Sequence, residues 1–464
     1  MTNKSGYKYL FKNIGLLTLG SFTTKILSFL LVPLYTSVLS TAEYGTYDLF
    51  SATIGVLLPL LTLNIQEAVV RFAIEKKTSR SSIVTISCKY YLISNGIVVV
   101  GLVLNQIFLF SSTLAAYSIL FFGMFLVQSL SGIMTNYIRG IDRVADLSIS
   151  SVISSAVTIA CNVLFLVVFK WGLTGYFIAN IIGPLIQSVY LIIRSHFFSE
   201  ISIQNYSDEE KEMTKYSKPL IANSIAWWIN NVSDRYIITF FCSLAENGIY
   251  SVAGKIPALL NIFQDIFSQA WTLSVVRDFD SEDKNGFFSN TYKAYSCLLT
   301  IVCSGIIVFD KMLARFLYAK DFYLAWKYVP WLTIAILFGA LSGYIGGFFA
   351  AVKDSKIFAT STIIGATTNL ILNLIFTPIY GAIGAAIATA ICYFVVWLFR
   401  FFQSKKYIKL RVNIWRDMAA YVLLAIQSAL IMIDGMIMYV PVGAVFVSIC
   451  LLYLKDIKFI LVER

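Results

Sequence analysis

The chain carries little charge for its length. Asp, Glu, Lys and Arg make up 13% of its 464 residues, against about 25% in soluble domains, whereas hydrophobic residues make up 58%. Histidine occurs once, as His196, which argues against a histidine base or a multi-histidine metal site. The seven cysteines lie in apolar stretches and form no Cys-x-x-Cys pair, which indicates reduced core residues. This composition predicts an integral membrane protein.

Apolar runs long enough to cross a bilayer recur along the whole chain. A span needs about 20 apolar residues, and the runs predict fourteen spans, with twelve as the alternative. Their limits are 14–38, 46–70, 83–107, 115–138, 147–169, 175–193, 219–242, 249–275, 288–309, 327–350, 357–377, 382–399, 417–434 and 439–455. The first run is too long for a signal peptide and has no small-residue cleavage site, so we expect it to remain as a span.

The basic residues set the expected orientation. With both termini in the cytoplasm, most of the Lys and Arg residues lie on the inside, as the positive-inside rule requires. The outer loops hold only Lys170, Lys311, Arg315, Lys320 and Lys327. The net charge of +11 then largely reflects the orientation of the chain in the membrane and gives no indication of a nucleic-acid partner.

Two short stretches occur twice in the chain. "STAEYGTY" at 40–47 matches "SLAENGIY" at 243–250, and "WGLTGYFIANI" at 171–181 matches "YGAIGAAIATA" at 380–390. Each copy carries six predicted spans, an even number, so both keep the same orientation, which is a common transporter plan. The sequence therefore predicts an all-α integral membrane protein of about 14 transmembrane helices. Two six-helix bundles would be related by a parallel pseudo-two-fold axis, and two C-terminal helices would follow.

Polar segments divide the chain into five expected parts. These are an N-terminal bundle (1–198), a cytoplasmic linker (199–219), a C-terminal bundle (220–400), a basic amphipathic cytoplasmic segment (401–416), and two further transmembrane helices with a cytoplasmic tail (417–464). The stretch "RFFQSKKYIKLRVNIWR" at 400–416 mixes basic and bulky apolar residues. It suits either a helix on an anionic inner leaflet or an ordinary basic loop.

Charged and polar residues follow one face of the first, seventh and eighth predicted spans. A charge at the centre of a span costs about 2.5–3.5 kcal/mol, so it usually faces a protein interior or a water-filled cavity. These faces would line a cleft between the bundles. The residues are Lys25, Asn223, Trp227, Asn230, Asp234, Arg235, Lys255, Asn261 and Asp265. The alternative for any one charge is an interhelical ion pair, such as Asp234 with Lys25. Glu67 and Arg71 lie four apart on the second span, where they could pair.

Three stretches resemble a known family: "GSFTTKILSFLLVPLYTSVLSTAEYGTYDL" at 20–49, "YIRGIDRVADLS" at 137–148 and "SLAENGIYSVAGKIP" at 243–257. The family is that of the polysaccharide-repeat flippases (Wzx-type) of the MOP exporter superfamily, which has a MATE-like fold. The resemblance implies a V-shaped pair of bundles around a cationic cavity in the bacterial inner membrane. Such proteins move undecaprenyl-pyrophosphate-linked oligosaccharide to the outer leaflet by alternating access, alongside a polymerase and other polysaccharide-assembly proteins.

The candidate residues have distinct expected roles in such a transporter. Cationic side chains would hold the pyrophosphate, with Arg as a bidentate fork and Lys as a point charge. These cations are Lys25, Arg235 and Lys255. The side chains expected to meet sugar are Asn223, Trp227, Asn230 and Asn261. The carboxylates expected to orient the cations, or to carry a coupling proton or sodium ion, are Asp234 and Asp265. No cofactor is expected beyond an ion gradient or the membrane potential.

Other function classes stay open at this point. A multidrug or organic-cation antiporter of the same fold would favour net acidic faces, whereas cations predominate on these. A membrane-bound polysaccharide polymerase or ligase would normally need a large outer loop with catalytic Arg and His. The longest outer connection here is expected to run only from about 310 to 326. A transporter, rather than an enzyme, is therefore expected, and the sugar repeat, the coupling ion and the oligomeric state are left undetermined.

Overall fold

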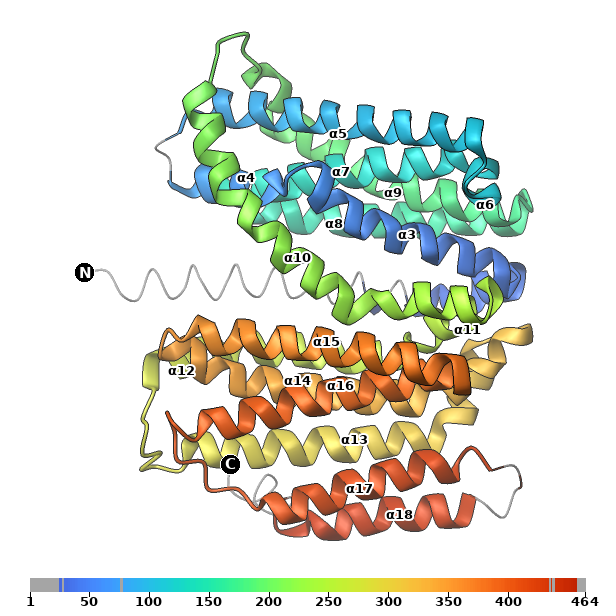
Figure 1. The fold of residues 1–464 in the computed structure, drawn as a ribbon, viewed down its shortest axis with the longest axis vertical. Coiled ribbons are helices and arrows are strands. Elements are labelled where there is room, and N and C mark those ends of the chain that lie inside the picture. The colour runs from blue at the N-terminus through green and yellow to red at the C-terminus, as the bar shows by residue number, and fades with distance from the viewer. Residues whose placement is uncertain (1–24, 27–28, 76–77, 434, 436–438, 457–464) are drawn as a thin grey trace. The chain divides into compact units, whose positions relative to one another are not determined.

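The computed structural model describes residues 25–26, 29–75, 78–433, 435 and 439–456. Within these ranges the regular structure is entirely helical, so the all-α prediction is confirmed. The chain forms two compact units, Met1–Trp228 and Ile229–Arg464, and the boundary between them falls inside helix α10 (Ser207–Phe241). Figure 1 shows each unit as a bundle of helices. Most of the first predicted span lies outside the described residues.

The first unit contains ten described elements before α10, counting η2 below. They are α2 (Val32–Val38), α3 (Thr41–Leu61), α4 (Ile65–Glu75), α5 (Arg80–Phe108), α6 (Ser112–Ala116), α7 (Ser118–Gly140), α8 (Val144–Asn162) with the π-helical turn η1 (Val163–Val168), and α9 (Gly172–Ser195). A short 3-10 helix, η2 (Phe197–Glu200), follows α9. Part of the core joins α4, α5, α7 and α9 through Val69, Ile83, Met134 and Leu191, which are fully buried or nearly so.

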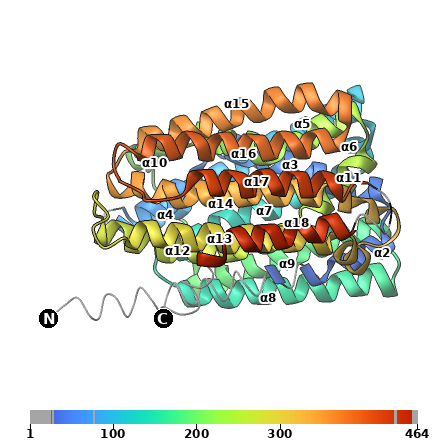
Figure 2. The ribbon, with the colours of Figure 1, turned by 90° about the horizontal axis from the view of Figure 1, so that it is seen from below.

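The second unit is organised around α14. Its helices are α11 (Leu244–Ala253), α12 (Ala258–Asp278), α13 (Phe287–Leu317), α14 (Val329–Ala351), α15 (Ser355–Tyr380), α16 (Ala382–Ser404), α17 (Ile414–Leu430) and α18 (Tyr439–Leu452), with the 3-10 helix η3 (Lys320–Lys327) between α13 and α14. Trp271 stacks on Tyr344 of α14 with ring centroids 3.9 Å apart, inside an aromatic core that includes Phe348 and Trp397. Helices α17 and α18 pack on each other and on α13 (Figure 2).

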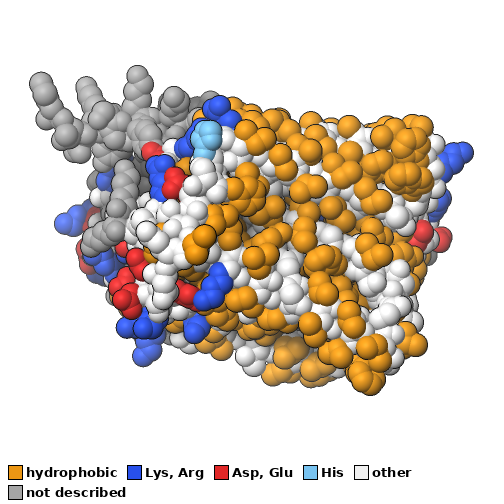
Figure 3. All heavy atoms as spheres, turned by 90° about the horizontal axis from the view of Figure 1, so that it is seen from above, with side chains coloured by type: hydrophobic (Ala, Val, Ile, Leu, Met, Phe, Trp, Pro, Cys, Tyr) orange, Lys and Arg blue, Asp and Glu red, His pale blue; other side chains and the backbone are white. Residues whose placement is uncertain are grey.

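Nine helices of the described ranges are long and apolar enough to cross a membrane: α3, α5, α7, α8 with η1, α9, α13, α14, α15 and α16. Figure 3 shows a broad apolar surface on one face of the molecule, with charged side chains gathered toward its two ends. The protein is therefore a multi-pass membrane protein. The count of fourteen spans stays a prediction, because α10 begins with a polar stretch and α17 and α18 have only 17 and 14 residues.

Two predicted spans, 46–70 and 249–275, are each broken into two helices, so the expectation of continuous spans is wrong there. Between α3 and α4, Leu63 and Asn64 adopt left-handed φ values of 52° and 54°. Between α11 and α12 the chain makes a turn that ends at Pro257, whose ring nitrogen has no hydrogen to continue the helical ladder. In other transporters, broken helices of this kind supply backbone groups to binding sites.

The structure also decides the form of two polar segments. The second half of the expected linker is the start of α10, where three acidic residues in the first turn favour a helix N-terminus. Of the two possibilities for the stretch 400–416, the basic loop describes residues 405–413, which are not helical. The amide of Lys409 donates instead to the Ser281 carbonyl (3.0 Å), and that of Arg411 donates to Ser289 Oγ (2.8 Å). Because these amides bond to the loop and helix nearby, the segment is an anchored basic loop.

Candidate functional site

The repeated acidic stretch starts a helix in each unit. At the start of α3, Ser40 Oγ accepts a hydrogen bond from the Glu43 amide (3.3 Å), and Glu43 Oε2 accepts one from the Ser40 amide (2.8 Å). This reciprocal pair is a capping box. At the start of α11, Ser243 Oγ accepts from the Glu246 amide (3.1 Å), while the Glu246 carboxylate accepts from the Tyr328 hydroxyl. The same Ser-x-x-Glu spacing therefore caps α3 and α11.

The repeated glycines also have equivalent positions. Gly172 and Gly381 have φ of +53° and +65° at the starts of α9 and α16, a conformation that glycine adopts without strain. Three residues later, Gly175 and Gly384 allow close approach of the chain. A Cβ at Gly384 would lie 2.3 Å from the Phe376 carbonyl oxygen. The two copies of the motif thus turn the chain and seat the following helix in the same way.

The candidate residues of the seventh predicted span lie on α10, and their surroundings change along that helix. Asn223 is exposed and Trp227 is 62% exposed, both within the first unit. In the second unit, Asn230 donates a hydrogen bond to the Thr362 carbonyl (3.2 Å). Asp234 is only 7% exposed. The structure therefore places Asp234 in the interior of the second unit.

A connected set of polar groups surrounds Asp234. Its Oδ2 accepts a hydrogen bond from the Tyr250 hydroxyl of α11 at 2.5 Å. The Thr389 hydroxyl of α16 adjoins the same Tyr250 oxygen and accepts from Asn369 of α15 at 3.4 Å. Asn369 Oδ1 accepts in turn from Asn373 Nδ2 at 3.1 Å. Four helices, α10, α11, α15 and α16, thus contribute to one buried polar network.

Two oxygen atoms on the α15 side of this network accept no hydrogen bond from the described residues. Asn373 Oδ1 and Thr377 Oγ1 are buried, and neither has a hydrogen-bond partner among the described residues. Carboxylate, amide and hydroxyl oxygens are the ligands that hard cations prefer, and a buried carboxylate can also hold a proton. In the described ranges, no group of three His, Cys, Asp or Glu could hold a metal ion. The donor set is one carboxylate together with neutral amide and hydroxyl oxygens.

Sequence reasoning missed the α15 part of this network. Asn369, Asn373 and Thr377 recur at every fourth position, so they lie along one face of a helix. That spacing was a usable signal, but the three residues carry no charge and stand among apolar neighbours. A search for charges within the membrane therefore passes over them.

The remaining candidates are distributed over both units. Lys255 is half-buried in the turn between α11 and α12, close in the chain to the end of α11. Arg235 is half-buried beside Asp234 on α10. On α12, Asn261 is half-buried and Asp265 is exposed, and Lys25 is exposed in the first unit. A cavity shared by the two bundles stays a prediction, as do the substrate-contacting roles of these residues.

The structure pairs Arg71 with a different acid from the one expected. Arg71 Nη2 lies 2.6 Å from Glu75 Oε1, one turn toward the end of α4, whereas Glu67 is half-buried one turn earlier. Both acids satisfy the four-residue spacing. The Glu75 pair stays partly exposed and so avoids the desolvation of a buried pair. In the described structure Arg71 therefore pairs with Glu75, and a role for Glu67 stays a prediction.

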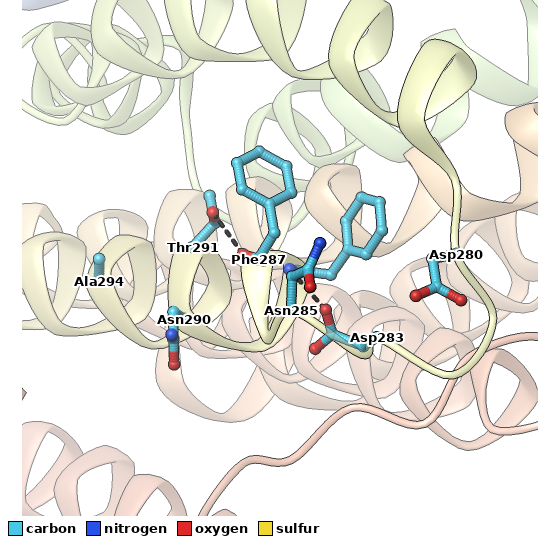
Figure 4. A pocket seen from close by; sticks show the side chains of 8 residues that line it. Asp280, Asp283, Asn285, Phe287, Asn290, Thr291 and Ala294 are labelled. Carbon is cyan, nitrogen blue, oxygen red and sulfur yellow. Dashed lines mark hydrogen bonds between the residues drawn. The ribbon is translucent and has the colours of Figure 1, made fainter.

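An open cleft of about 690 Å³ lies where the loop after α12 meets the start of α13 (Figure 4). Asp283 accepts hydrogen bonds there from the amides of Phe288 (3.0 Å) and Ser289 (2.9 Å), so it stabilises the start of α13. Hydrogen bonds from the amides of Lys284 and Glu282 lower the pKa of Asp280. Backbone amides donate hydrogen bonds to both carboxylates, so the two side chains stabilise the conformation of this loop. The lining residues are Asp280, Asp283, Asn285, Phe287, Phe288, Asn290, Thr291 and Ala294.

Comparison with known proteins agrees with this architecture. A family model described as "Polysaccharide biosynthesis protein" matches residues 10–272. A probable low-salt glycan biosynthesis flippase, Agl15 of Haloferax volcanii, is 25% identical over 190 residues, and this match spans only 40% of either chain.

Solved structures show the same fold at low identity. The lipid II flippase MurJ in an inward closed conformation is 17% identical, with a TM-score of 0.69 over 96% of this chain and 98% of that chain. An inward-facing multidrug resistance MATE family transporter of the MOP superfamily is 13% identical, with a TM-score of 0.66 over 82% of this chain and 95% of that chain. The fold implied by the sequence resemblance is therefore confirmed, and the chain belongs to the polysaccharide biosynthesis protein family.

Proposed function

We propose that the protein is a flippase that moves an undecaprenyl-pyrophosphate-linked oligosaccharide from the inner to the outer leaflet of the plasma membrane. The family match over more than half of the chain carries this proposal. The likeness of the fold to a lipid II flippase supports it. The half-buried cations Arg235 and Lys255 supply the chemistry that a diphosphate headgroup needs in a low-dielectric site.

The buried network around Asp234 is the proposed place for a coupling proton or sodium ion. Binding of a cation would neutralise the Asp234 carboxylate and alter the hydrogen bond from Tyr250, which ties α10 to α11. The proposed cycle is alternating access, in which the two units change their relative arrangement. A membrane that is negative inside would also drive an anionic headgroup outward, by about 2.3 kcal/mol per charge per 100 mV.

A multidrug antiporter is the second candidate, because a MATE family transporter has the same fold. A cationic drug would be repelled by Arg235 and Lys255. Depleting the protein in its native host separates the two candidates. A lipid-linked repeat that accumulates and resists a membrane-impermeant glycosidase on intact cells would establish blocked flipping. Sensitivity to cationic dyes without such accumulation would establish the antiporter instead.

The role of Arg235 can be tested against a charge outside the proposed site. Arg235→Ala is expected to reduce export severely, because the headgroup loses a cationic contact. The matched control is Lys89→Ala, since Lys89 is exposed and its Nζ pairs with Glu210 at 2.7 Å. Export is measured as surface polysaccharide at equal protein abundance. Equal and small losses in the two variants would contradict the assignment.

A further inference from the structure

A buried arginine near the end of α16 forms no ion pair with a carboxylate of the described residues. Arg400 is 6% exposed, although its sequence position suggested a basic loop. Its Nε donates to Ser361 Oγ of α15 (2.8 Å) and its Nη1 donates to the Ser342 carbonyl of α14 (3.1 Å). Among the residues that the structure describes, no carboxylate forms an ion pair with Arg400, and its Nη2 donates no hydrogen bond.

A single aromatic ring covers this guanidinium. The Cζ atom of Arg400 lies 4.2 Å from the ring centroid of Phe358 on α15, and Phe358 itself is 48% exposed. Gly346 of α14 leaves the space for this pair, because a Cβ there would lie 3.2 Å from both Arg400 Nη1 and the Phe358 ring. The cation is therefore enclosed on the α14 side and screened by a half-exposed side chain on the α15 side.

Burial of a charge is costly unless the charge is paired and hydrogen-bonded. The two neutral acceptors from Ser342 and Ser361 and the ring face compensate for only part of the lost hydration. The donors left over, on Nη1 and Nη2, form the planar fork that binds two oxygens of a phosphate. A bound anion would supply the counter-charge that no carboxylate of the described residues supplies to Arg400.

We propose that Arg400 is a binding site for a phosphate-bearing lipid headgroup and that Phe358 is the cover that moves aside to admit it. This inference rests on the proposed function, since it gives the diphosphate a contact at the expected cytoplasmic end of the second unit. The positions of Arg400 and Phe358 near helix ends support this proposal. Arg400 lies four residues before the end of α16, about 6 Å along the axis, and Phe358 lies in the first turn of α15.

The test uses the full-length protein in detergent with three probes: farnesyl pyrophosphate, inorganic pyrophosphate and farnesol. Affinity is measured by calorimetry, and association is followed by stopped-flow tryptophan fluorescence. Arg400→Gln is expected to weaken farnesyl pyrophosphate binding at least tenfold and to leave farnesol binding unchanged. Phe358→Ala is expected to speed association, because the guanidinium is then uncovered. The control Lys405→Gln removes an exposed charge from the same helix end and is expected to bind as the wild type does.

Each outcome bears on a different part of the argument. Wild-type affinity in Arg400→Gln, or unchanged association in Phe358→Ala, would overturn the Arg400 site and leave the flippase proposal standing. Equal affinity for inorganic and farnesyl pyrophosphate would overturn the assignment to a lipid headgroup. Absence of diphosphate binding in the wild type would count against the proposed function itself. If Arg400→Gln does not fold, Arg400→Lys, which keeps the charge without the fork, and Phe358→Ala still decide the question.

Discussion

Replacing Gly384 by alanine tests the close packing that the repeated glycine motif permits. The added Cβ would stand 2.3 Å from the carbonyl oxygen and 2.6 Å from the carbonyl carbon of Phe376. Even weak C–H···O contacts keep carbon and oxygen about 3.3 Å or more apart. The obstacle is backbone, so no side chain can rotate away, and α16 must move from the end of α15 by roughly 1 Å.

The expected loss of stability follows from these distances. Overpacking of this kind costs about 1–3 kcal/mol, and the better helix propensity of alanine returns at most about 1 kcal/mol. The 2.3 Å contact belongs at the upper end of that range, so the net loss is about 2 kcal/mol, which corresponds to a fall in melting temperature of about 4–8 °C for a unit of this size. Gly175→Ala in the first unit meets two Cβ atoms at 2.9 and 3.0 Å and the Phe165 carbonyl oxygen at 3.2 Å, a smaller overlap, and is expected to lose less.

The assay is heating of each purified variant in detergent, followed by size-exclusion chromatography of the protein that stays monodisperse. Gly443→Ala in α18 is the matched control, because no atom of the described residues lies within 4 Å of a Cβ at that position. Its stability is expected to stay the same or to rise slightly. If Gly384→Ala melts at the temperature of Gly443→Ala, the close approach of α15 and α16 at this point is refuted.

Three further predictions concern individual polar groups. Tyr250→Phe removes the hydroxyl that donates to buried Asp234 and is expected to cost about 1–3 kcal/mol in a melting assay; an unchanged melting temperature would contradict the network. Asp310 is fully buried and neither of its carboxylate oxygens has a hydrogen-bond partner within the described ranges, so Asp310→Asn is expected to melt no lower than the wild type. Asp417→Asn loses an ion pair with Arg416 (3.0 Å) and is expected to melt at a lower temperature than the wild type. If Asp310→Asn melts at a lower temperature than Asp417→Asn, both assignments are refuted. The hydrogen bonds from the Tyr407 hydroxyl and the Ile357 amide lower the pKa of Asp354 at the start of α15. A lowered pKa stabilises the fold above the unfolded value near 4 and ceases to do so as pH falls through the folded value. The protection of the amides at 356–358, relative to their intrinsic exchange rates, is therefore expected to fall in acid, and to do so at a higher pH in Tyr407→Phe; identical profiles would contradict the Tyr407 contact.

Much of the fold could be read from the sequence, because hydropathy and spacing are local properties. Runs of about 20 apolar residues have to satisfy their backbone hydrogen bonds internally in a membrane, which makes them helices. The Ser-x-x-Glu pair at Ser40 and Glu43 is itself a helix start, and its copy at Ser243 recurs where the second unit begins the same element. The helical spans and the repeat were visible for this reason, whereas the MOP-type fold was implied by the resemblance to a known family.

The candidate site was visible only in part. Asp234 was identifiable because a charge within a span is rare and costly. Thr389 and Asn369, which join its network through Tyr250, lie more than a hundred residues away along the chain, and no local pattern links them to it. The same holds for Arg71, whose two acids four residues away are equivalent by spacing and are distinguished only by their exposure.

The sequence alone determined that this chain is a helical membrane protein with a doubled motif and with charges inside its spans. Only the tertiary structure decided where two spans break, that Arg400 is buried, and which neutral groups receive its hydrogen bonds. The physical reason is that hydrophobicity acts through composition along each segment, whereas pairing and burial of a polar group depend on which other helices surround it.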